Sequence, residues 1–98
     1  MKEHDFEAEA HEHRAHRRWA EARLCYMKLI DQGCSPINRA KMEANIMQMF
    51  ELEGSIEDAK RWGNLALESV REAGYYEPEE GDGVRGYVEG TLQPTFPK

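Results

Sequence analysis

The sequence predicts an all-α fold of two antiparallel helical hairpins, four helices in all, with a C-terminal extended or disordered tail. Three observations lead to this prediction. Apolar residues recur every three or four positions in 16–32, 36–53 and 55–73, which is the spacing of an amphipathic helix. Serine and glycine residues that favour helix ends stand between those segments. β-branched residues are few, and no segment alternates apolar and polar residues as a strand would.

Each of the three clear helical segments carries one apolar face. The faces comprise Trp19, Ala22, Tyr26, Leu29 and Ile30 in the first, Ile37, Ala40, Ala44, Met47 and Phe50 in the second, and Ala59, Trp62, Ala66, Val70 and Ala73 in the third. Residues 3–15 have a thinner apolar face and an acidic beginning, which suits the positive end of a helix dipole. We expect a fourth helix there, with fraying ends.

The boundaries between the helices are marked by particular residue types. Ser35 followed by Pro36 predicts an N-cap and the first residue of a helix, where the missing proline N–H costs nothing. Gly33 and Gly54 are predicted to end the helices that precede them. Ser55 is predicted to cap the next helix, with an acidic residue three positions later as in a capping box.

The last part of the chain differs in composition from the rest. Gly74 is predicted to end the helix of 55–73, and 75–98 contain four further glycines and three prolines among acidic residues. Such a composition disfavours a long helix. We therefore divide the chain into a helical domain, 1–74, and an acidic tail or arm, 75–98. The tail is expected to be disordered or loosely docked, or else to bind a groove on this molecule or another.

Composition limits where the protein works. The acidic residues 1–12 lack the apolar segment of a secretory signal and the basic character of a transit peptide. No stretch approaches the roughly 20 apolar residues of a membrane span. We therefore expect a cytoplasmic protein with two reduced thiols, Cys25 in the core or at a helix seam and Cys34 more exposed in a turn.

Charge is distributed unevenly along the chain. The net charge is −6, yet residues 14–42 hold seven Lys or Arg side chains and only two acidic ones. A basic middle between acidic ends suggests charge complementarity within the molecule or with a partner. The acidic balance argues against general nucleic-acid binding, which depends on neutralising phosphates.

The two hairpins can be superimposed at a shift of 37 residues, so that Ala22 falls on Ala59. Residues 40–73 span 34 residues and carry Phe50, Gly54, Ile56, Ala59, Gly63 and Ala66 at characteristic positions. This segment resembles a tetratricopeptide repeat, and 3–36 resemble a degenerate second copy. The first copy has Arg17 where a turn glycine is expected. Two repeats are fewer than the roughly three that a self-sufficient stack needs, which favours a dimer, a docked tail or an obligate partner.

The resemblance implies a concave surface lined by the first helix of each hairpin. Mapped onto this sequence, the partner-binding candidates are His4, Glu7, His11, Arg14, Lys41, Asn45, Gln48 and Glu51, with Ala44 among them. Lys41 and Asn45 partly fit the chemistry by which members of the family hold a peptide carboxylate. Glu7 does not fit that chemistry, so a chaperone-tail ligand is not expected.

Histidines raise a second possibility. His4 and His11 share one face of the first helix, and His13 and His16 share another. A structural zinc site needs about four converging ligands, and no matching Cys or His cluster accompanies them. The interpretation of solvated histidines is preferred, and no metal or cofactor is expected. The basic run 13–18 is short for a nucleic-acid patch and lacks exposed aromatic residues.

The sequence contains no pattern typical of a nucleophile with its base, nor a phosphate-binding glycine loop, so we do not expect an enzyme. Our first hypothesis is a protein-interaction module, such as an adaptor, a small chaperone or an inhibitor-like protein, that binds another protein or peptide through a helical groove or apolar edge. The second is a self-assembling structural homodimer. The third, a histidine-based metal or nucleic-acid binder, stays open.

Overall fold

The computed structural model describes residues 5–73 and 78–92, and within those ranges it contains five helices and no strand. Their bounds are α1 Phe6–Ala15, α2 Trp19–Asp31, α3 Pro36–Glu53, α4 Ile56–Ala73 and α5 Pro78–Leu92. The predicted all-α class is therefore confirmed.

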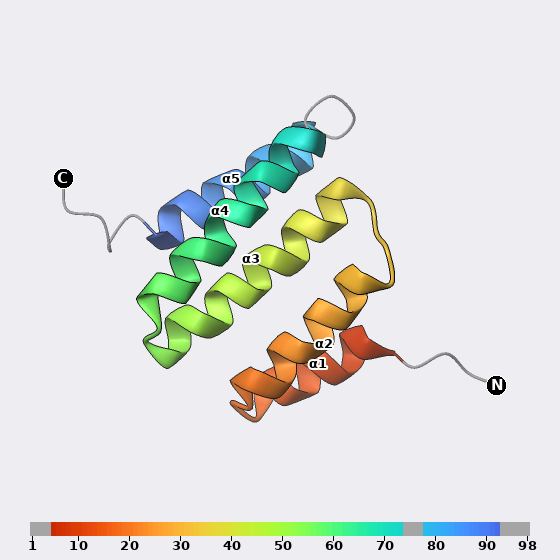
Figure 1. Cartoon of the computed structure of the whole chain (residues 1–98), viewed down its shortest axis with the longest axis vertical. Coiled ribbons are helices and arrows are strands. Elements are labelled where there is room, and N and C mark those ends of the chain that lie inside the picture. Colours follow the sequence, from red (N-terminus) through yellow and green to blue (C-terminus); the bar gives the residue numbers. More distant parts are fainter. Residues whose placement is uncertain (1–4, 74–77, 93–98) are drawn as a thin grey trace.

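Successive helices run in opposite directions along the stack (Figure 1). Helix α1 packs against α2, α2 against α3, and α3 against α4, while α5 packs on both α4 and α3. Helix α3 is therefore the central element, since it contacts neighbours from both ends of the chain. Any surface that α3 shares with α1 and α5 brings together residues far apart in the sequence.

The predicted boundaries of α3 are confirmed in detail. The hydroxyl of Ser35 accepts a hydrogen bond from the backbone N–H of Asn38 at 3.3 Å, and Pro36 is the first helical residue. Gly54 closes the helix in the left-handed conformation, with φ of +84°. Gly33, after α2, has φ of +94°. Glycine carries no Cβ to oppose these values, which is why it terminates both helices. The predicted stop at Gly74 lies outside the described residues.

The turn between α1 and α2 is made without glycine. Arg17 adopts φ of +60°, a left-handed conformation unusual for a residue with a side chain. Its N–H and that of Arg18 donate to carbonyl oxygens of α1. Hydrogen bonds thus hold Arg17 in a conformation that usually favours glycine. Helix α1 itself begins at Phe6, capped by Asp5, whose carboxylate accepts from the N–H of Ala8 at 3.0 Å.

Two clusters of buried side chains form the core. One joins α3, α4 and α5 through Ala44, Met47, Ala59, Ala66 and Val88. The other joins α1, α2 and α3 through Ala10, Cys25, Tyr26 and Ile46. Phe50 and Trp62 pack against both clusters, so the two hairpins share part of their apolar interior.

The prediction for the C-terminal segment needs correction, because Pro78–Leu92 form a helix instead of an extended or disordered arm. The buried side chain of Val88 and the half-buried one of Val84, four residues apart, face the core formed by α3 and α4. A Cβ at Gly83, Gly86 or Gly90 would meet no atom within 4 Å, so these glycines lie on open faces of the helix. Packing of the valines therefore outweighs the low helix propensity of the glycines. The division at 74 and 75 stays a prediction, and 75–77 and 93–98 lie outside the described residues.

Candidate functional site

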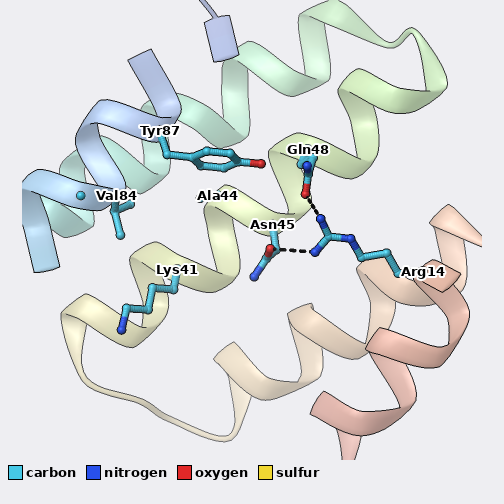
Figure 2. A pocket seen from close by; sticks show the side chains of 8 residues that line it. Arg14, Lys41, Ala44, Asn45, Gln48, Val84 and Tyr87 are labelled. Atoms are coloured by element: carbon cyan, nitrogen blue, oxygen red, sulfur yellow. Dashed lines mark hydrogen bonds between the residues drawn. The ribbon is translucent and has the colours of Figure 1, made fainter. Parts of the chain in front are cut away.

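A pocket of about 460 Å³ lies where α1, α3 and α5 meet. It is lined by Arg14, Lys41, Ala44, Asn45, Gln48, Gly83, Val84 and Tyr87. Figure 2 shows the polar side chains of α1 and α3 on one side and Val84 and Tyr87 on the other. The pocket therefore combines a charged and amide-bearing wall with a partly apolar one.

The wall formed by α3 follows from helix geometry. Lys41, Asn45 and Gln48 are separated by four and three residues, so they share one face of the helix. Ala44 lies beside them and is almost fully buried, which brings the floor of the pocket close to the helix backbone. The same face is the one that the sequence predicted to line a groove.

Arg14 connects α1 to this wall. Its guanidinium donates one hydrogen bond to Oδ1 of Asn45 at 3.3 Å and another to Oε1 of Gln48 (Figure 2). Both acceptors are neutral amide oxygens, and no acidic side chain in the described ranges forms an ion pair with Arg14. The guanidinium is thus positioned by hydrogen bonds while its positive charge is not neutralised, which leaves that charge able to attract an anionic group.

The opposite wall comes from α5, which lies in the segment predicted to be a tail. Tyr87 is 41% exposed, and its ring extends across the pocket toward α3 in Figure 2. Val84 lies one turn earlier and is half-buried. The available signal was the spacing of Val84, Tyr87 and Val88 by three and four residues, which the surrounding glycines obscured.

The structure brings together only part of the predicted partner-binding set. Arg14, Lys41, Asn45 and Gln48 line the pocket, together with Ala44. Glu7 lines a different hollow of about 310 Å³, formed with Leu29, Gln32, Gly33, Cys34, Asn38 and Met42. His11, exposed on α1, and Glu51, half-buried on α3, line neither of these two hollows. His4 lies outside the described residues.

A second group of chemically active side chains lies between α1 and α2. Glu9, His13 and Cys25 each place one potential ligand atom within 4.8 Å of the other two. Cys25 is buried, and burial, followed by the negative charge of Glu9, raises the pKa of its thiol. Sequence spacing alone relates His13 to His16 and does not reveal this group, because Cys25 comes from another helix.

The buried carboxylate of Glu43 lies elsewhere, at the seam between α3 and α4. The Ser69 hydroxyl donates to it at 2.6 Å, and Nε of Arg39 donates to the Ser69 oxygen at 2.9 Å. Arg39 also forms an ion pair with Glu72. Burial raises the pKa of Glu43, opposed by the Ser69 hydrogen bond and the Arg39 charge. Glu43 lines neither hollow described above, so its evident role is to join two helices.

Hydropathy adds one finding about the helices. Within 5–73 and 78–92, none is both long and apolar enough to cross a bilayer.

Comparison with known proteins places the chain in a family. No curated protein and no solved structure matches the sequence significantly. A protein-family match does cover residues 8–89, from within α1 to within α5, and so includes both walls of the pocket and the Glu9, His13 and Cys25 group. Because that match spans most of the chain, the protein belongs to the family described as Domain of unknown function (DUF6340).

Proposed function

We propose that this protein is a protein-interaction module, an adaptor, small chaperone or inhibitor-like protein, that holds a partner's peptide segment in the pocket between α1, α3 and α5. The observation that carries the proposal is the lining of that pocket, where two cationic side chains and two amides face an aromatic and an aliphatic side chain. The proposal includes a tetratricopeptide-like arrangement of the hairpins, a cytoplasmic location and no enzymatic activity.

The charges define the partner's chemistry. Among the described residues that line the pocket, Arg14 and Lys41 carry a positive charge and none is acidic. The acidic Glu7, which weighed against an anionic ligand in the sequence, lines a different hollow. The favoured occupant is therefore a peptide with an acidic side chain or carboxylate placed beside an apolar residue. The acid meets the cationic wall, while the apolar residue packs against Val84 and Tyr87.

The guanidinium of Arg14 is held in place by hydrogen bonds to α3. Asn45 and Gln48 receive the Arg14 hydrogen bonds, so the guanidinium is oriented before any ligand arrives. Such preorganisation lowers the entropy that binding must overcome.

The experiment selects peptides from a random display library against the full chain and then compares variants by fluorescence anisotropy. Selected peptides are expected to carry an acid next to an apolar residue. Lys41→Gln should weaken their binding about tenfold, a change within the range of one charge-assisted contact. Arg71→Gln removes an exposed cation that does not line the pocket and serves as the charge-matched control. Binding that survives Lys41→Gln and Val84→Asp unchanged would place the ligand elsewhere and overturn the proposal.

A second candidate, a homodimer, is favoured by exposed leucines near one end of the hairpins. Leu24 is 56% exposed and Leu52 is 50% exposed. Their neighbours Arg23 and Glu53 form an ion pair, which brings these parts of α2 and α3 together. Light scattering over a concentration series tests the homodimer. The homodimer is supported if the wild type dimerises and the Leu24→Gln, Leu52→Gln double variant has a higher dissociation constant. A wild type that is monomeric at every concentration excludes it.

A further inference from the structure

Three different donor types converge at the interface of α1 and α2. The carboxylate of Glu9, the imidazole of His13 and the sulfur of Cys25 each offer an atom within 4.8 Å of the others. Nε2 of His13 lies 3.4 Å from Oε1 of Glu9, and the Cys25 sulfur lies within 4.8 Å of a potential ligand atom of each. The carboxylate thus has both other donors close beside it.

The positions of these residues follow from the hairpin itself. Glu9 and His13 are four residues apart, so they project from the same face of α1, the spacing by which helical residues hold metals. Cys25 lies near the middle of α2, which packs directly against that face. Because the sulfur is buried and the other two donors are partly exposed, a cation would enter from the α1 side.

We propose that Glu9, His13 and Cys25 form a zinc site that joins α1 to α2. Zinc accepts thiolate, imidazole and carboxylate ligands together, at about 2.0–2.3 Å, in a tetrahedral arrangement. Ligand atoms in such a tetrahedron are about 3.3–3.8 Å apart. The Glu9 and His13 atoms, 3.4 Å apart, already have this spacing, and the Cys25 sulfur, within 4.8 Å of both, needs to approach by at most about 1 Å. The flexible Glu9 side chain allows this, and a water molecule or a partner's side chain completes the fourth position.

The side chain of Arg18 competes with zinc coordination by His13. Its Nε donates a hydrogen bond to Nδ1 of His13 at 2.8 Å, which places the imidazole proton on Nε2, the atom facing Glu9. Coordination through Nε2 moves that proton to Nδ1, where it would confront the Arg18 donor. Zinc binding therefore requires the exposed Arg18 side chain to turn away, and removing that side chain should favour binding.

The site is separate from the pocket. None of its three residues lines that pocket, and it requires neither a peptide partner nor the proposed interaction function. A bound ion would hold α1 and α2 together, in addition to the hydrogen bonds of the turn at Arg17. Ligand binding to the native state alone raises stability, so zinc should raise the melting temperature of the chain.

The test uses the reduced full chain, with Co²⁺ as a spectroscopic probe and Zn²⁺ as the competitor. Cobalt bound to a thiolate gives a charge-transfer absorption that histidines alone cannot produce. We expect this band at one equivalent of Co²⁺, and its displacement by one equivalent of Zn²⁺. Cys25→Ser should abolish the band, whereas Cys34→Ser, which removes the exposed thiol, should leave it intact.

Surface variants keep the test independent of folding, in case Cys25→Ser disturbs the core. Glu9→Gln and His13→Gln should each weaken Zn²⁺ binding at least about tenfold. His16→Gln, at an exposed position outside the group, should not. Arg18→Ala should bind Zn²⁺ about fivefold more tightly, as expected for the loss of one competing hydrogen bond. A missing cobalt–thiolate band, a band that depends on Cys34, or equal affinity in His13→Gln would overturn the site.

Discussion

Ser69 on α4 donates a hydrogen bond of 2.6 Å to the buried carboxylate of Glu43 on α3. This bond and the nearby Arg39 only partly compensate for burial, since the pKa of Glu43 is still raised above its ordinary value of 4.5. The ionised carboxylate is therefore less stable in the folded protein than in the unfolded chain.

Glu43→Gln should make the protein more stable at neutral pH. Below pH 4.5 the wild-type carboxyl is protonated in both states, and the penalty is absent. As pH rises from 4.5 to the raised folded pKa, the unfolded chain releases the proton while the folded protein keeps it, so wild-type stability falls relative to the variant, and above the folded pKa the penalty is fully present. Urea unfolding at pH 4 and pH 7.5 measures this. A stability difference between wild type and variant that is the same at both pH values would contradict this prediction. Stability of Ser69→Ala should depend on pH more strongly than that of the wild type, because the hydrogen bond that lowers the pKa of Glu43 is lost.

Tyr26→Phe should leave stability unchanged or raise it by about 1 kcal/mol. The Tyr26 side chain is 1% exposed, and its hydroxyl has no hydrogen-bond partner in the part of the chain that the structure covers. Removing an unsatisfied buried hydroxyl removes its desolvation cost while the ring keeps its packing. Chemical denaturation gives the difference. A loss of more than 1 kcal/mol would mean that the hydroxyl has a partner in solution.

Alanine should have opposite effects at two glycines. At Gly54 a Cβ would meet no atom within 4 Å, but φ of +84° makes alanine strained, so Gly54→Ala should cost about 1 kcal/mol. At Gly90 the space is equally open and the backbone is helical, so Gly90→Ala should stabilise the protein by up to about 1 kcal/mol. Thermal unfolding of both variants separates backbone strain from helix propensity.

Val88→Asp should release α5 from the α3 and α4 surface. The wild-type side chain is 0% exposed, and its burial contributes about 1.5–3 kcal/mol. An aspartate there would be charged and unpaired, so detachment of the helix costs less than burial of the charge. Hydrogen exchange should show lost protection in α5 and retained protection in α3. Glu89→Lys, at the neighbouring exposed position, is the control and should keep α5 protected.

The sequence predicted those features that depend on local chemistry. Ser35 and Gly54 act within one turn of their own helix, so their effect can be read from neighbouring residues. Arg17 could not be foreseen as left-handed, because the conformation is held by hydrogen bonds of its hairpin rather than by its residue type. Helix α5 was missed for a similar reason: its stability comes from Val88 meeting residues of α3 and α4 that lie far away in the chain.

The same distinction holds for the two sites. Helical periodicity places Lys41, Asn45 and Gln48 on one face, and the resemblance to a tetratricopeptide repeat pointed to that face as a groove. Their connection to Arg14 and Tyr87 depends on how three helices pack, which periodicity does not specify. The Glu9 and His13 spacing was visible as well, but the choice of Cys25 as the third donor depends on the register between α1 and α2.

Phe50 and Trp62 pack against both core clusters, so the interiors of the two hairpins are joined. Heating should therefore melt the first four helices in a single cooperative transition, with fluorescence of the tryptophans and circular dichroism giving the same midpoint. An ion bound between the first two helices would then protect the fourth from unfolding, because Trp62 of α4 packs against the core cluster that includes residues of α1 and α2. Binding of an ion at one end of the molecule would then change how readily the other end unfolds.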